Sequence, residues 1–345
     1  MKAIIHFFSG TGNTARAVQI IAARLEAAGF EVARRTIAGR AEPPAEIPDL
    51  TVVAFPIWAW AAPHFVRAYA RRLPRAACAR AAVFATCGGF GAQGVGEVER
   101  ILRRRGYRVA CSGEAVYPDN WLLAVDPPTG ADLKDALAEG DQAVQLFANN
   151  CFSDEPARFR CAWGHMLWSW PMAMLFRVFG RRVLGKFFIA DARCTSCGQC
   201  AAACPVQAIR MEGTPKLPRW GANCAGCYRC INLCPAQAIQ ISVPRMVVHL
   251  GLNLALTVGW FLAIGWIRGR LPPMAGAAQW TLALLAATAV YAALTIFQLT
   301  AVDGALRGLA ARAPLRGWFR WSYTKTFRRY RAPGFHPERT DVLSR

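Results

Sequence analysis

The chain has 345 residues, of which 54% are hydrophobic and 18% are charged. This composition excludes intrinsic disorder, and 13 cysteines in so long a chain do not indicate a small secreted disulfide scaffold. The net charge of +20 lies mainly in the second half: residues 1–150 carry 17 basic and 14 acidic side chains, and residues 151–345 carry 24 and 7. Such a basic balance is typical of proteins that bind nucleic acid, anionic lipid or an acidic partner.

Residues 1–150 alternate strand and helix patterns. Strands are predicted at residues 4–8, 31–37, 51–57, 81–86 and 109–116, and helices at residues 15–28, 64–73, 95–105 and 132–147. Strands separated by helices of this length favour a parallel sheet with right-handed crossovers. We therefore predict one doubly wound α/β domain with a five-strand parallel sheet.

A hydroxyl-rich glycine loop lies between the first strand and the first helix, formed by Ser9, Gly10, Thr11, Gly12, Asn13 and Thr14. Backbone N–H groups at a helix N-terminus, together with hydroxyls, favour binding of one phosphate group. The loop formally fits the dinucleotide pattern G-x-G-x-x-A, but the acidic residue expected at the end of the second strand is missing, since Glu31 begins that strand. A Walker loop is excluded because no Lys follows the glycines. The loop suits a terminal monoester phosphate, as in FMN.

With these residues the loop closely resembles that of flavodoxins, and the strand order is similar over the same region. The resemblance implies a ring-stacking aromatic after the third strand, among Pro56, Ile57, Trp58, Ala59 and Trp60. It also implies a second flavin-facing loop after the fourth strand, formed by Thr86, Cys87, Gly88 and Gly89. Ordinary packing of the tryptophans is the alternative, and Cys87 is expected to act through its backbone. Residues 117–121 are a further candidate for contact with the ring.

Residues 151–186 form an aromatic and basic linker. Its apolar stretch, residues 163–176, is too short to cross a bilayer and is flanked by Arg160 and Arg177. We predict a segment lying in the membrane interface, with basic residues facing headgroups. Packing between the two neighbouring modules is the alternative.

Eight cysteines form the pattern C-x2-C-x2-C-x3-C-P twice within residues 187–243. Three closely spaced cysteines hold one [4Fe–4S] cluster and the fourth ligates the other. This predicts cluster one on Cys194, Cys197, Cys200 and Cys234, and cluster two on Cys224, Cys227, Cys230 and Cys204. Two zinc sites are the alternative, although zinc favours separated C-x2-C pairs.

The region resembles the bacterial two-cluster ferredoxins, which implies a compact α+β, pseudo-twofold domain with both clusters close together. Residues 1–243 as a whole resemble the fused ferredoxin–flavodoxin proteins of prokaryotes. The resemblance ends after Val243, because the fused form has no membrane hairpin.

Residues 244–303 contain two apolar runs, 246–267 and 280–302, without a Lys, Arg, Asp or Glu. Each would form a helix of roughly 33 Å, enough to cross a hydrocarbon core of about 30 Å. We predict a two-helix transmembrane hairpin; a buried core helix is the alternative. Two arginines lie in the loop and many basic residues in the tail, 304–345, so both termini and the redox domains are expected in the cytoplasm, at the inner membrane. The aromatic and basic segment 318–330 favours lipid over nucleic acid.

We expect a membrane-anchored electron-transfer flavoprotein that passes single electrons between FMN and two [4Fe–4S] clusters, to or from a redox partner protein. One alternative is an oxidoreductase that itself reduces a quinone-like substrate, with His249 and Asn253 near the headgroup. Another is an electron-transfer or scaffold subunit of a larger complex. No general acid–base pair or nucleophile constellation stands out, which argues against hydrolytic or transferase chemistry and leaves an electron carrier or an oxidoreductase as the expectation.

Overall fold

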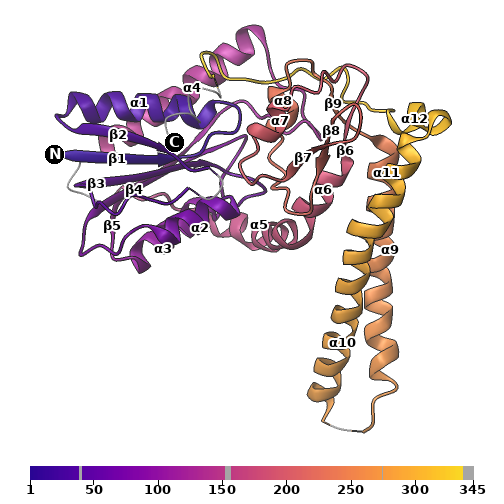
Figure 1. Cartoon of the computed structure of the whole chain (residues 1–345). Helices are drawn as coiled ribbons and strands as arrows, with labels where there is room; N and C mark the ends of the chain where they lie inside the picture. The colour runs from indigo at the N-terminus through magenta and orange to yellow at the C-terminus, as the bar shows by residue number, and fades with distance from the viewer. Residues whose placement is uncertain (39–40, 152–156, 274, 337–345) are drawn as a thin grey trace.

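The computed structural model describes residues 1–38, 41–151, 157–273 and 275–336. Within them, an α/β module, a cysteine-rich module and a long helical hairpin follow one another along the chain (Figure 1).

The α/β module is built on a five-stranded parallel sheet in the order β2-β1-β3-β4-β5. Its strands are β1 (Lys2–Phe7), β2 (Glu31–Thr36), β3 (Leu50–Pro56), β4 (Arg80–Cys87) and β5 (Arg108–Val116). Helices α1 (Asn13–Ala27) and α4 (Gly130–Asn150) cover one face, and α2 (His64–Arg72) and α3 (Gly94–Arg104) the other (Figure 1). This strand order is that of flavodoxin-like doubly wound sheets, so the predicted fold class is confirmed. The central strand β3 is almost wholly buried, as a strand covered on both faces must be.

The cysteine-rich module has two short antiparallel ladders. One pairs β6 (Phe188–Ala190) with β9 (Ile239–Ile241), and the other pairs β7 (Ile209–Glu212) with β8 (Leu217–Trp220). Each cysteine motif contributes one short helix, α7 (Gln199–Ala202) or α8 (Arg229–Leu233). In the core of this module, Phe188 packs edge-on against Trp220 and against Tyr228. The module is therefore α+β, as predicted.

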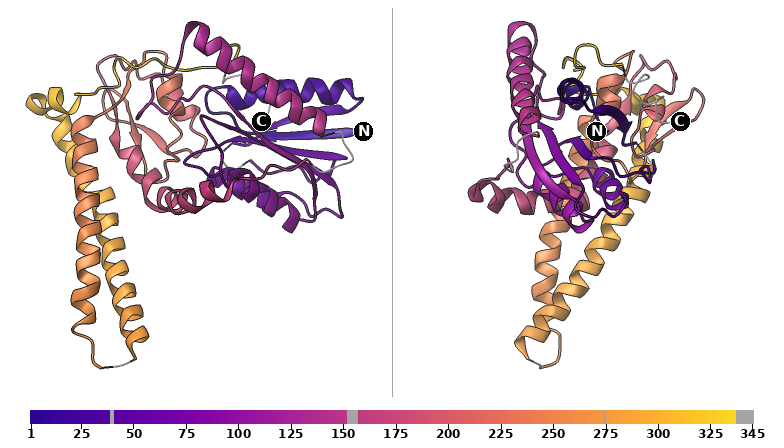
Figure 2. Two further views of the ribbon diagram at one scale, coloured as in Figure 1. Left: turned by 180° about the vertical axis from the view of Figure 1, so that it is seen from behind. Right: turned by 90° about the vertical axis from the view of Figure 1, so that its left-hand side faces the viewer.

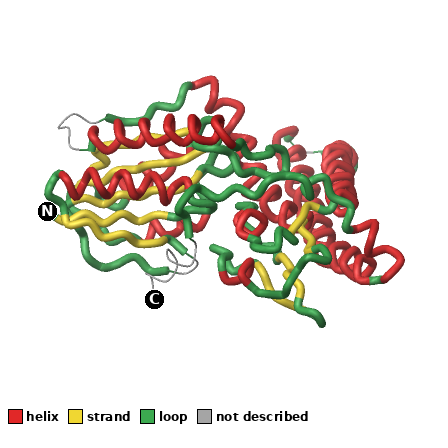
Figure 3. Tube along the Cα trace, turned by 90° about the horizontal axis from the view of Figure 1, so that it is seen from above, coloured by secondary structure: helices red, strands yellow, loops and turns green. Residues whose placement is uncertain are grey.

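Two long helices form the hairpin, α9 (Val243–Arg268) and α10 (Gly276–Phe297). The second continues through residues Gln298–Val302 into α11 (Asp303–Ala311), and the short α12 (Ala313–Phe319) follows. Both helices are long and apolar enough to cross a membrane. They face each other through small residues such as Ala283 and Ala287, whereas Leu254 is 67% exposed and Leu285 62%. The hairpin extends away from the two modules, and from above it lies beside them (Figures 2 and 3).

The helix α5 (Trp163–Leu175) connects the modules. One side contacts α3 and its preceding loop, since the Ser169 hydroxyl donates to Gln93 Oε1 at 2.9 Å and Arg177, just beyond α5, pairs with Glu97. The other side exposes Trp163 and Leu167, which are 87% and 81% exposed. Figure 1 shows α5 on the side of the modules toward which the hairpin extends. The linker thus packs on the α/β module with one face and exposes an apolar face on the other; its place in a membrane interface stays a prediction.

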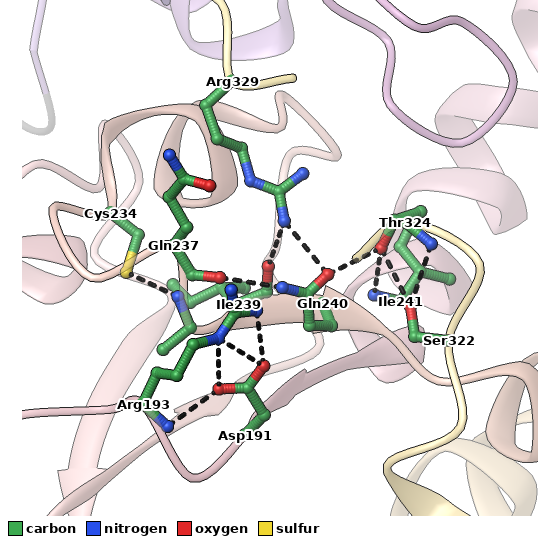
Figure 4. A network of polar contacts seen from close by, with 11 residues as sticks. Asp191, Arg193, Cys234, Gln237, Ile239, Gln240, Ile241, Ser322, Thr324 and Arg329 are labelled. Atoms are coloured by element: carbon green, nitrogen blue, oxygen red, sulfur yellow. Dashed lines mark hydrogen bonds and ion pairs between the residues drawn. The ribbon is translucent and has the colours of Figure 1, made fainter. Parts of the chain in front are cut away.

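The tail returns from the hairpin across both modules (Figure 2). Tyr323 Oη donates to the carbonyl of Leu123 at 2.7 Å, and the Arg328 N–H donates to Asp126 Oδ1 at 2.8 Å. Figure 4 shows Arg329 donating to the carbonyl of Ile239 (3.1 Å) and to Gln240 Oε1 (3.0 Å), near Cys234. Within the aromatic and basic segment 318–330, Trp318 and Trp321 are exposed, whereas Ser322, Thr324 and Tyr330 are buried against the modules.

Candidate redox site

The hydroxyl-rich loop is shaped around Ser9. Its Oγ accepts hydrogen bonds from the backbone N–H groups of Gly12 (3.1 Å) and Ala15 (3.2 Å), which orders the start of α1. The Thr14 hydroxyl, in the first turn of α1, lies 2.8 Å from the Thr86 hydroxyl, so the start of α1 is held against the carboxyl end of β4. Residues 9–14 therefore lie at the carboxyl edge of the sheet, where ligands of doubly wound folds bind.

A polar cavity of about 50 Å³ opens beside this loop. Four loops and one cysteine of the other module line it: Ser9, Gly10, Thr11, Asn13, Thr14, Pro56, Ile57, Trp58, Thr86, Cys87, Gly88, Pro118, Asp119, Asn120 and Cys227. Of the predicted residues, Gly12, Ala59, Trp60 and Gly89 are not in this lining. The cavity has room for a few waters or one small polar group, so a whole nucleotide would extend beyond it.

The two tryptophans after β3, Trp58 and Trp60, have different surroundings. Trp58 and Ala61 exchange backbone hydrogen bonds of 3.0 and 3.1 Å around a tight turn, with positive φ at Ala59 (45°) and Trp60 (60°). Non-glycine residues in this region cost on the order of 1 kcal/mol each, and such strain is concentrated at functional loops. Trp58 lines the cavity, whereas Trp60 packs against Trp168 of α5 with ring centroids 4.7 Å apart.

The Cys87 thiol is buried, and burial raises its pKa to about 12. The thiol therefore stays protonated near neutral pH and is a poor nucleophile. The thiol donates a hydrogen bond to the carbonyl of Ala115 at 3.7 Å, so its proton is directed at the neighbouring strand β5.

The loop after β5 also lines the cavity, through Pro118, Asp119 and Asn120. Asn13 Nδ2 donates to the carbonyl of Pro118 at 3.0 Å, and Asn120 donates to the Thr11 hydroxyl. Tyr117 instead donates its hydroxyl to Asp141 at 2.9 Å, and Trp121 is outside the cavity lining. Within residues 117–121, only the middle three reach the cavity.

The eight cysteines separate into two cavities. One is lined by Cys194, Cys197, Cys200 and Cys234, and the other by Cys204, Cys224, Cys227 and Cys230. Each cavity thus takes three cysteines from one motif and one from the other, which is the grouping that the spacing predicts.

The two motifs share their backbone conformation. Positive φ occurs at Ser196, Gly198 and Gln207 in the first motif and at the equivalent Gly226, Tyr228 and Gln237 in the second. Backbone N–H groups also point at sulfur in both, from Ala208 to Cys204 (3.2 Å) and from Ala238 to Cys234 (3.3 Å). Hydrogen bonds to sulfur are one of the factors that set cluster potentials.

The described residues contain no group of three or more His, Cys, Asp or Glu side chains that could hold a single metal ion. Four zinc ligands would have to converge within about 2.3 Å of one ion. A [4Fe–4S] cluster instead takes each thiolate on a different iron, which keeps the sulfurs apart. Each cysteine group offers four thiolates, the number that one [4Fe–4S] cluster takes.

The α/β module and the cysteine-rich module meet at the polar cavity beside residues 9–14. Cys227 lines both this cavity and that of its own cysteine group. The neighbouring Arg229, which is 3% exposed, donates from Nη1 to the carbonyl of Ser9 at 3.3 Å. One cysteine motif is thereby fixed against the phosphate-type loop.

A buried ionic cluster lies where the hairpin joins the modules, and sequence reasoning missed its centre, Asp303. The Asp303 carboxylate is fully buried and pairs with Lys186 (2.9 Å), Arg245 and Arg307. His249 Nε2 lies 3.7 Å from the same carboxylate, and Gln298 donates to the His249 carbonyl at 2.9 Å. His249 has no exposed surface, so this placement favours a structural role over contact with a quinone.

A family model described as a 4Fe-4S dicluster domain matches residues 187–241. Among solved structures, a Streptococcus pneumoniae flavodoxin is 17% identical, with 42% of this chain and 99% of that chain covered and a TM-score of 0.31. Flavodoxin 2 from Bacillus cereus is 18% identical, covering 44% and 97% with a TM-score of 0.33. The flavodiiron core of Flv1 from Synechocystis is 16% identical, covering 44% and 36% with a TM-score of 0.30. No curated protein matches the chain.

Proposed function

We propose that the chain is a membrane-anchored electron-transfer protein that holds FMN and two [4Fe–4S] clusters and exchanges electrons with a redox partner protein. The observation that carries this proposal is Cys227, which lines the cavity of the hydroxyl-rich loop and that of a cysteine group at once. When bound, FMN exchanges electrons in pairs or singly, whereas each cluster carries one.

The loop cavity supports the FMN site. Backbone N–H groups and hydroxyls at the start of α1 suit a phosphate, and the buried Arg229 guanidinium adds positive charge beside Ser9. Trp58 supplies an aromatic surface at the same cavity. We assign phosphate contact to residues 9–14 and ring contact to Trp58 and to the loops at residues 86–88 and 118–120.

The two cysteine cavities support two clusters. Cys194, Cys197, Cys200 and Cys234 would hold cluster one, and Cys204, Cys224, Cys227 and Cys230 cluster two. Cluster two would thus adjoin the flavin through Cys227. Cluster one would lie nearer the hairpin, because Cys194 also lines the cavity at the start of α9. All eight ligand positions are filled by cysteine, which favours electron transfer over chemistry on an open iron.

Bare apolar surface supports the membrane anchor. Leu254 and Leu262 on α9, and Leu285 and Ile296 on α10, are each more than 60% exposed, which a core helix of a soluble domain would not be. The exposed face of α5 adds apolar surface on the same side. The excess of Lys and Arg in the tail favours redox modules in the cytoplasm.

The test is reductive titration of the full chain, purified from membranes in detergent without oxygen. We expect one FMN, about eight irons per chain, and electrons that redistribute between flavin and clusters as reductant is added. Cys227→Ser should lose cluster two and slow this exchange, while Cys161→Ser, outside both cysteine cavities, should behave as the parent.

Two outcomes would contradict the proposal. Zinc in place of iron would show that the chain holds no clusters, and a flavin that never equilibrates with the clusters would show that electrons do not pass between them.

Rapid turnover of a quinone analogue by the isolated chain would favour the oxidoreductase alternative. Activity only in a stoichiometric complex would favour the scaffold alternative.

A further inference from the structure

A second kind of cavity lies outside the proposed electron path and touches it only at Cys194. Its volume is about 450 Å³, within the range of ligand sites in proteins. It lies at the end of the hairpin that joins the modules. The first turn of α9, helices α11 and α12, and the β7–β8 ladder surround it. Cys194, from the first cysteine group, forms part of its wall.

The cavity is strongly basic. Five arginines line it, against two carboxylates, Asp191 and Glu212: Arg219, Arg245, Arg307, Arg316 and Arg320. Both carboxylates are already paired inside the protein, Asp191 with Arg193 (2.7 Å) and Glu212 with Arg219 (3.2 Å). The lining therefore attracts an anion.

Two of these arginines are available to a ligand. Arg245 and Arg307 are held by Asp303, but Arg316 makes one hydrogen bond, to the carbonyl of Ala311 at 2.9 Å. The Arg320 guanidinium has no hydrogen bond or ion pair within the part of the chain that the structure describes. Their spacing of four residues places both side chains on one side of α12 and its end.

The surroundings indicate the kind of anion. Trp318 and Trp321, beside these arginines, are 53% and 61% exposed, a composition typical of the headgroup level of a bilayer. An apolar, exposed row begins on α9 two residues after Arg245, with Val247, Leu250 and Leu254 at helical spacing. Basic pockets at the cytoplasmic end of spanning helices bind the phosphates of acidic lipids.

We propose that this cavity binds the headgroup of an anionic phospholipid, with its phosphate held by Arg316 and Arg320. The acyl chains would lie along the exposed row of α9. The inference rests on the membrane anchoring proposed above and is independent of the flavin and the clusters.

The experiment uses the full chain in an uncharged detergent and short-chain phosphatidylglycerol as the probe, with bound lipid counted by native mass spectrometry. We expect saturable binding of one phosphatidylglycerol and binding of phosphatidylcholine weaker by about tenfold or more. Arg316→Gln/Arg320→Gln should weaken phosphatidylglycerol binding by a similar factor. Arg71→Gln/Arg75→Gln, which removes the same charge from an exposed edge of the α/β module, should not.

Inorganic phosphate separates the two sources of the anion. Failure of free phosphate to displace the lipid supports a phospholipid site, whereas displacement at equal concentration assigns the cavity to a soluble anion and overturns the proposal. Equal binding of both lipids, or unchanged binding in Arg316→Gln/Arg320→Gln, also overturns it. A chain recovered from the soluble fraction without detergent would instead refute the membrane anchoring itself.

Discussion

The backbone N–H of Ala332 donates to the carbonyl of Thr11 at 2.8 Å, which joins the last described segment of the chain to the loop before its first helix. Tyr330 donates its hydroxyl to Asn13 Oδ1 in the same region, and its N–H donates to Asn232 Oδ1 at 3.0 Å. One short segment thus contacts the phosphate-type loop and the second cysteine motif. Because this segment follows the hairpin in the chain, the tail connects the hairpin to the candidate redox site.

Gly12→Ala should release this connection. Gly12 has φ +114°, and a Cβ there would lie 2.6 Å from the Cβ of Ala332 and 2.7 Å from that of Phe335. Strain and overpacking together should lower the free energy of unfolding by roughly 2 to 5 kcal/mol and weaken flavin binding. Gly29→Ala is the matched control, since Gly29 has φ +84° but open space around it. Equal stability of the two variants in denaturant titrations would show that the tail contact is unimportant.

Trp58→Leu and Trp60→Leu should differ in their effect on flavin affinity. Trp58 lines the loop cavity and Trp60 packs against Trp168 instead. Loss of the Trp58 ring should weaken FMN binding by about 0.5 to 1.5 kcal/mol. Fluorescence titration of the flavin-free chain measures this, and Trp60→Leu should bind FMN as the parent does. The reverse order would assign ring contact to Trp60.

Asp303→Asn should destabilise the junction between hairpin and modules. The change leaves Lys186 and Arg245 buried without their counter-ion, which costs about 3 to 5 kcal/mol. Thermal unfolding in detergent should show a large drop. Glu46→Gln removes only the exposed pair with Lys2, so its effect should stay within about 1 kcal/mol. A small effect of Asp303→Asn would mean that the cluster contributes little to stability.

The pH dependence of stability should carry the signature of His6. Burial lowers the pKa of His6 to about 4, and its Nδ1 lies 2.9 Å from the Tyr69 hydroxyl. The unfolded chain, with a pKa of about 6.5 for this histidine, therefore binds more protons between pH 4 and pH 6.5. The contribution of His6 is fully present above pH 6.5 and is lost as the pH falls through this window, by about 2 kcal/mol at pH 5.

Denaturant unfolding at pH 7 and pH 5 measures this loss. His6→Asn should reduce the difference in the free energy of unfolding between pH 7 and pH 5. Part of the difference should remain, because burial also lowers the pKa of His64 to about 4. A His6→Asn variant with the same pH slope as the parent would contradict the assignment.

Thiol labelling should report the orientation of the chain. Cys78 is exposed on the α/β module, whereas the turn of the hairpin lies at the end of α9 and α10 that is farther from the modules (Figure 1). In intact cells an impermeant maleimide should label Arg270→Cys but not Cys78, and Cys78 should become reactive after permeabilisation. A Cys78→Ser chain identifies labelling at other cysteines. Labelling of Cys78 in intact cells would place the redox modules outside.

The sequence by itself determined the elements whose signals are local. Apolar strands alternating with helices gave the parallel sheet, the loop at residues 9–14 followed from its neighbours in the chain, and the spacing of eight cysteines divided them into the two groups that line separate cavities. The long uncharged runs likewise determined the two hairpin helices. These features depend on periodicity and spacing, which a sequence displays directly.

Only the tertiary structure decided the contacts between distant segments. Cys227 meets the loop of residues 9–14 across more than two hundred residues, Asp303 becomes the counter-ion of Lys186, and Ala332 reaches Thr11. The aromatic and basic segment 318–330 had the composition of a membrane interface; in the structure Trp318 and Trp321 are exposed, whereas Tyr323 and Tyr330 contact the α/β module. Charge and hydrophobicity specify that a side chain needs a partner, but which partner it finds depends on the packing of whole modules.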